Sequence, residues 1–306
     1  MTASIYKVNL GEILKVIPYS PNIKGIFSTD LHYIQSGDER SIAVEASVDN
    51  LRYENSAIGN LACSAIYLPK EDNTHFVDAR ISLDGDEVAS LTGDYKSAEN
   101  DNLDALLSLN HLPLKMVNGF IPEHLMTLEG DLDGEVTLKG PSSSPLINGQ
   151  VKLDSVYLSS EMYGARFRMD DHPLVIADSK ILFDDFSVYT QKDNPFRLAG
   201  DINFADFSNI LFNLRMTARN YELINAPKRK NSILFGKVFV DVFSTLQGNL
   251  DNLKMRGNIN VLGNTDVNYI LKDSPLTVED RLSGLVTFVD FNDTVTVNDK
   301  IIAPIY

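Results

Sequence analysis

The stretch RSIAVEASV, residues 40–48, alternates apolar and polar residues, and this pattern decides the fold of the chain. The apolar residues occupy every second position, namely Ile42, Val44, Ala46 and Val48. A period of two places these side chains on one face of a β-strand. The same alternation returns in FRLAGDINF (196–204) and KVFVDVFSTLQGNL (237–250). An apolar sheet face must pack against another layer or against an apolar ligand, and the function depends on which of these covers it.

Composition and charge exclude several classes of protein. The chain has 306 residues, of which 43% are hydrophobic and 23% charged, as in ordinary folded proteins. Its 27 basic and 42 acidic residues give a formal net charge of -15. This balance argues against nucleic acid as a partner. The single cysteine, Cys63, excludes an intrachain disulfide, and its apolar surroundings predict a buried, inert thiol.

The ends of the sequence resemble cut ends rather than natural ones. The start, MTASIYKVN, lacks the basic and apolar regions of a signal peptide, and the end stops within a strand-like run. No window of 18 apolar residues is present that would cross a bilayer as a helix. We therefore expect the chain to be a segment of a longer protein, with a single continuous architecture over residues 1–306.

A short glycine motif recurs along the chain. It reads apolar, any residue, Gly, polar, apolar. It appears as LTGDY, LEGDL, INGQV, LAGDI, LQGNL and MRGNI, centred on Gly93, Gly130, Gly149, Gly200, Gly248 and Gly257. Glycine on an apolar face predicts close backbone approach or bending of the sheet. Turn-rich segments such as KGPSSSPLING join the alternating runs, which number on the order of twenty and predict an antiparallel sheet.

Helical signals are few and short. The segments at 9–18, 112–122 and 274–285 have the caps and spacing of short helices, and Asn9 is the expected N-cap of the first. None of the three is long enough to cover a large sheet. The predicted fold class is therefore all-β, with helix below about a fifth of the residues.

Motifs that carry catalysis or bind cofactors are missing. The sequence contains no HExxH, GxSxG, Walker or GxGxxG motif, and its five histidines have no helical metal-ligand spacing. LEGDLDGEV imitates the first half of a calcium loop, but Gly140 stands where that loop needs a glutamate. We therefore predict a protein that is not an enzyme and uses neither metal nor cofactor.

The segment from Leu103 to Asn292 resembles the TamB family, part of the AsmA-like group of bacterial envelope proteins. The resemblance is carried by LPLKMVNGFIP, followed by LEGDLDGEVTLKGPSSSPLINGQVKL, and by GKVFVDVFSTLQGNLDNLKMRGNINVLGNTDV. This ordered series of glycine motifs is similar above all to Bacteroides-type members. Residues 1–102 fit the family more loosely. We expect the N-terminal membrane anchor and the C-terminal end that the family implies to lie outside this segment.

The resemblance implies a fold, a location and a function. The expected fold is a long antiparallel sheet curled lengthwise into a β-taco, an open solenoid-like trough with an apolar lumen. The expected location is the periplasm, with a tether to the inner membrane through a segment absent from this chain. The expected function, that of a translocation and assembly module, is phospholipid transport between the two membranes, outer-membrane protein assembly and secretion, or both. The implied partners are phospholipid acyl chains and an outer-membrane assembly barrel protein.

The period-two phasing selects the residues expected to line that lumen. They are Val136, Leu138, Val151, Leu153, Leu198, Ile202, Phe204, Val238, Val240, Val242, Ile259, Val261, Tyr269 and Leu271. A second hypothesis stays open on the residues alone. In it the chain is a stacked β-hairpin scaffold or adhesin that acts through protein contacts, and its apolar face is a closed core.

Overall fold

The computed structural model describes most of the first 270 residues. The described ranges are 1–17, 20–36, 39–54, 56–70, 73–97, 101–121, 126–160, 164–190, 194–228 and 234–270. The chain divides into two units, Met1–Asn268 and Tyr269–Tyr306, and the following description concerns the first. The predicted helix at 274–285 and the predicted lining residue Leu271 lie outside the described residues. The expectation of one continuous architecture over the whole chain stays a prediction.

Seventeen strands form a single sheet. Their bounds are β1 Thr2–Asn9, β2 Ile23–Ser36, β3 Glu39–Tyr53, β4 Ser56–Pro69, β5 Thr74–Leu83, β6 Asp86–Lys96, β7 Asn102–Pro113, β8 Thr127–Gly140, β9 Leu146–Ser160, β10 Ala165–Met169, β11 Leu174–Ala177, β12 Lys180–Tyr189, β13 Phe196–Asn203, β14 Leu211–Ala226, β15 Leu234–Asn249, β16 Lys254–Val261 and β17 Asp266–Tyr269. Strands make up 75% of the described residues and helices 6%. The prediction of an all-β protein with little helix is confirmed.

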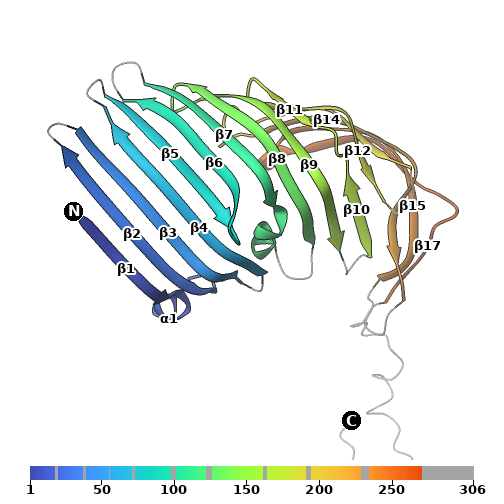
Figure 1. Ribbon diagram of the computed structural model, residues 1–306. Helices are drawn as coiled ribbons and strands as arrows, with labels where there is room; N and C mark the ends of the chain where they lie inside the picture. Colours follow the sequence, from blue (N-terminus) through green and yellow to red (C-terminus); the bar gives the residue numbers. More distant parts are fainter. Residues whose placement is uncertain are drawn as a thin grey trace, which may run out of the picture. The chain divides into compact units, whose positions relative to one another are not determined.

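The strands pair antiparallel in chain order, as Figure 1 shows for β1 to β9. Strands β10 and β11 share the place after β9, and both pair also with β12. Pairing then continues from β12 to β16. Apart from β11, which pairs with β9 and β12, the strands from β2 to β16 pair with the strand before or just after them in the chain, which is the antiparallel order that the turn-rich segments predicted.

Three short helices lie at strand ends. They are α1 Leu10–Leu14 and the 3-10 helices η1 Leu114–Phe120 and η2 Leu250–Asn252. The first two confirm the predicted helical segments, although the Asn9 side chain makes no capping hydrogen bond. Helix η1 packs on the sheet, where Met116 contacts a cluster of Ile58, Leu83 and Val88. The ring of Phe120 stacks on Tyr53 at 4.4 Å between centroids.

The recurring glycines lie where neighbouring backbones come close. A Cβ atom added to any of the six motif glycines would lie within 3 Å of backbone atoms of a nearby strand or turn. At Gly200, for example, it would lie 2.1 Å from the carbonyl oxygen of Asn213, and the φ angle of Gly200 is +125°. This agrees with the close approach that the motif predicted.

Four bulges in the described strands share one hydrogen-bond arrangement. A residue in the left-handed conformation interrupts the register, and its N–H donates to a side chain on the next strand. The donor and acceptor pairs are Lys7 to Ser28 Oγ (3.1 Å), Asn50 to Asn60 Oδ1 (2.9 Å), His111 to Asp133 Oδ1 (2.8 Å) and Asn220 to Asp241 Oδ1 (2.7 Å). Since a bulge bends its strand and increases local twist, these bonds fix the curvature of the sheet at defined positions.

Candidate functional site

The strand register places an unbroken row of apolar residues across fourteen strands. Each member of the row is paired directly with the next, so their side chains share one face of the sheet. The row runs Ala3, Leu31, Val44, Ala65, Ala79, Leu91, Leu107, Val136, Gly149, Ile176, Ile181, Ile202, Phe212 and Gly248. We call the side of the sheet that carries this row the apolar face.

The neighbouring row points to the opposite side and is almost wholly polar. It runs Ser4, Asp30, Glu45, Ser64, Arg80, Ser90, Ser108, Glu135, Gln150, Val175, Leu182, Asp201, Asn213, Gln247 and Lys254. Only Val175 and Leu182 depart from the pattern. We call this side the polar face. The two sides of one sheet thus have opposite chemistry from β1 to β15.

Most of the predicted lining residues lie on the apolar face. Val136 and Ile202 belong to the row itself, and nine others lie beside it in phase: Leu138, Val151, Leu153, Leu198, Val238, Val240, Val242, Ile259 and Val261. Phe204 lies just past the end of β13, with its ring 6.0 Å from that of Phe207. Tyr269 ends β17 and is 65% exposed. Whether any of these residues contacts lipid stays a prediction.

The apolar face is closed over β12–β15. Strand β10 reaches across it, and the ring of Phe167 packs parallel to that of Tyr221, with 6.5 Å between centroids. Phe196 meets the same tyrosine edge-on at 5.6 Å. Tyr221, Val240 and Val242 are 2%, 3% and 5% exposed, and this burial raises the pKa of the Tyr221 hydroxyl. These strands therefore bury their apolar side chains in a conventional core.

Over β1–β7 the same face is covered at one end, where η1 packs beside Leu83, and is exposed elsewhere. Ile5, Leu31, Ile81 and Leu91 retain between 37% and 51% of their side-chain exposure. Cys63 pairs with Ala46 and Ile81 on this face and is exposed, so the prediction of a buried thiol was wrong. The physical reason is that alternation places a residue on a face of the sheet but does not show what covers that face. Sequence reasoning chose no lining residue before Val136, although the alternation at 42–48 indicated that this face begins near the N-terminus.

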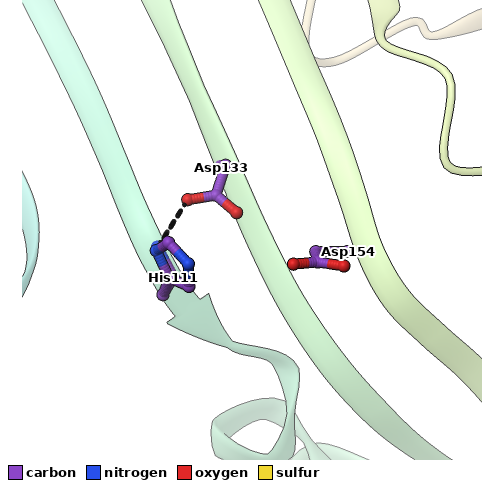
Figure 2. A group of neighbouring side chains, drawn as sticks. All are labelled: His111, Asp133 and Asp154. Carbon is purple, nitrogen blue, oxygen red and sulfur yellow. Dashed lines mark hydrogen bonds and ion pairs between the residues drawn. The ribbon is translucent and has the colours of Figure 1, made fainter.

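Three side chains gather on the polar face at the bulge of β7. His111, Asp133 and Asp154 come from β7, β8 and β9 (Figure 2). One imidazole nitrogen and one oxygen of each carboxylate, the atoms that could ligate a metal ion, lie within 4.8 Å of one another. Asp133 Oδ1 already accepts the N–H of His111 and lies 3.1 Å from its Nδ1. The bulge therefore accounts for the contact of His111 with Asp133, and the cluster by itself carries no functional assignment.

A second group, Asp170, Asp171 and His172, forms the turn between β10 and β11. Asp170 Oδ1 lies 2.5 Å from His172 Nδ1, and the carboxylate also accepts the N–H groups of His172 and Ser187. Burial alone would raise the pKa of Asp170, but the hydrogen bonds outweigh it and lower this pKa. The hydrogen bond to Asp170 raises the pKa of His172. The turn is thus held by the Asp170–His172 hydrogen bond, which becomes an ion pair when His172 is protonated.

The comparisons with known proteins leave the chain without a named relative. No family model, no curated protein and no solved structure matches it. In the described part of the chain, no helix is long and apolar enough to cross a membrane.

Proposed function

We propose that the sheet curls lengthwise into a trough, a β-taco, whose apolar face holds phospholipid acyl chains. The chain then acts without catalysis, as a periplasmic segment of a lipid-transport or outer-membrane assembly protein. The observation that carries this proposal is the apolar row that continues without interruption over fourteen strands, since a compact core does not need such length. At about 4.8 Å per strand the row extends for about 65 Å, several times the size of a lipid headgroup.

The exposure of side chains on the apolar face supports an occupant from outside the chain. The exposed apolar-face side chains include Ile5, Leu31, Ile81, Leu91, Ile259 and Val261. Contiguous exposed apolar surface marks an interaction site. Each methylene group of an acyl chain that moves from water onto such a surface contributes about 0.8 kcal/mol. An acyl chain on the apolar face would therefore remove unfavourable surface from both partners.

Coverage along the sheet suggests where lipid would lie. On β2–β7 the face is exposed at Leu31, Ile81 and Leu91, outside the patch around Leu83 that η1 covers, whereas Val240 and Val242 are covered by protein. The lipid-binding part is therefore proposed over β2–β7. The burial over β12–β15 favours the second candidate, a scaffold with a closed core, for those strands alone.

The test uses two leucines of matched exposure on adjacent strands. Leu91 of β6 lies on the apolar face and is 37% exposed, and Leu106 of β7 lies on the polar face and is 39% exposed. Leu91→Glu and Leu106→Glu therefore introduce the same charge at equal exposure on opposite sides. Binding of a fluorescent phosphatidylcholine and native mass spectrometry of copurifying lipids are measured for the parent and both variants.

We expect the parent protein to carry phospholipid in both measurements. Leu91→Glu should lose most of the bound lipid and keep the thermal midpoint of Leu106→Glu, which should bind as the parent does. A parent without lipid in both measurements, or equal binding by the two variants, would overturn the proposal and leave the scaffold hypothesis.

A further inference from the structure

The polar face changes sign along the sheet, which the net charge of the chain conceals. Strands β8 and β9 carry five acidic and two basic residues. Strands β13–β16 carry six basic and three acidic residues, a local charge of +3 in a chain whose net charge is -15. A basic surface on an acidic protein requires an explanation, because it is not needed for solubility.

Within this basic region lies a cavity of about 450 Å³ on the polar face. Its lining includes Pro195, Arg197, Thr217, Arg219 and Phe243. Arg197, Thr217 and Phe243 are directly paired neighbours on β13, β14 and β15, so their side chains leave the sheet side by side. The cavity is therefore built largely by the register of three strands, with Asn194 and Pro195 contributed by the residues just before β13.

The side chains of the cavity suit an anion that carries an organic group. Among the described residues neither Arg197 nor Arg219 forms an ion pair, so both guanidinium groups are free to bind an oxyanion. Thr217 adds a hydroxyl donor. The Arg219 guanidinium lies 5.7 Å from the centroid of the Phe243 ring, and this ring is 42% exposed on an otherwise polar side. Arginine binds phosphate through two parallel hydrogen bonds, and an exposed ring offers a surface for an apolar substituent.

We propose that this cavity binds a phosphate monoester, with the two arginines on the phosphate and Phe243 against the attached group. The site lies on the side of the sheet opposite the apolar face, so it does not depend on the proposed lipid trough. A phosphate monoester can belong to a small soluble molecule or to the headgroup of phosphatidic acid. The volume exceeds that of a bare phosphate and falls in the range of small-molecule pockets.

The experiment compares soluble and lipid-borne phosphate on the same variants. Isothermal titration calorimetry with phenyl phosphate and inorganic phosphate provides the first arm, and sedimentation with phosphatidylcholine vesicles containing phosphatidic acid provides the second. The variants are Arg197→Gln and Arg219→Gln. The control is Arg256→Gln, which removes the same charge from the same face on β16, outside the cavity.

Each cavity variant should weaken phenyl phosphate binding about tenfold, whereas the control should change it less than about twofold. Phe243→Leu should weaken phenyl phosphate and leave inorganic phosphate unchanged. If the cavity variants weaken binding of both the vesicles and the soluble probes, the site accepts the phosphate of lipids as well as that of soluble molecules. If they weaken binding of the vesicles and the soluble probes do not bind, the site accepts lipid-borne phosphate alone. No binding in either arm overturns the proposal. Equal weakening by all three arginine variants also overturns it, because that result means a diffuse basic surface.

Discussion

Strands β2–β7 and β12–β15 carry the same apolar face with different side chains. In the first group the face is rich in small residues, such as Ala46, Ala65, Ala79 and Ala105, and it stays partly open. In the second group it carries Phe186, Phe196 and Tyr221. The Tyr221 ring stacks on Phe167 of β10 and meets the Phe196 ring edge-on. The alternation is identical in the two groups. The volume of the side chains therefore separates a partly exposed surface from a filled core.

The largest expected contrast between the two groups is their tolerance of a buried charge. Val240→Asp places a carboxylate among Ala218, Tyr221 and Val242. We expect a loss of about 4 kcal/mol in the free energy of unfolding, because the charge has no partner and no water there. Val44→Asp, on the open part of the same face, should cost about 1–2 kcal/mol. Urea unfolding of both variants measures the contrast, and equal losses would show that the two groups are covered alike.

Close approach of strands in the second group should make Gly200 nearly irreplaceable. Gly200→Ala places a Cβ against the carbonyl oxygen of Asn213 in a conformation with φ of +125°, and we expect a cost of about 3 kcal/mol. Gly140 provides the control. Its φ is +102°, but a Cβ there meets no atom within 4 Å, so Gly140→Ala should cost about 1 kcal/mol. Thermal unfolding compares the two, and similar midpoints would show that conformation rather than contact decides both costs.

The bulge bonds should stabilise both groups equally, unlike the apolar contacts. Asp241→Ala removes the acceptor for the Asn220 N–H, and Asn60→Ala removes the acceptor for the Asn50 N–H. Each change should lower the free energy of unfolding by about 1 kcal/mol. Asp241→Asn keeps an acceptor oxygen and should restore most of the loss. If urea titration shows a loss of unfolding free energy at only one of the two bulges, the bulge hydrogen bond stabilises only that group of strands.

The sequence predicted the strands well because alternation is a local signal. Ile42 to Val48 and Val238 to Val242 showed their faces directly, and the register confirms that these residues share one side. Coverage was not predictable in the same way. The burial of Val240 depends on Phe167 and Tyr221, which β10 and β14 bring together from positions far apart in the sequence. The exposure of Cys63 depends on the absence of such a neighbour among the described residues.

The candidate sites on the polar face were hidden for a related reason. Arg197, Thr217 and Phe243 are separated by long stretches of chain, and only the pairing of β13, β14 and β15 makes them neighbours. The meeting of His111 with Asp133 likewise requires the bulge of β7, which shifts the register by a residue that alternation cannot place. Sequence patterns therefore predicted which residues share one face of a strand, whereas the contacts between strands could be found only from the structure.

The smallest expected effect concerns the turn between β10 and β11, where the chain leaves the strand that covers the second group. The Asp170 hydrogen bond and charge raise the pKa of His172 above 6.5, so an NMR titration should place its midpoint above that value. Because the folded pKa is raised, the pair stabilises the fold fully below pH 6.5 and loses this contribution as pH rises through the raised pKa. The pKa of Asp170 is lowered below 3.8, so its contribution is lost only as pH falls through that lowered value. Asp170→Asn should return the His172 midpoint toward 6.5, and Asp171→Asn should move it less, since that carboxylate lies 3.8 Å away without a hydrogen bond. If both substitutions move the midpoint equally, the turn is held by general charge rather than by the Asp170 contact.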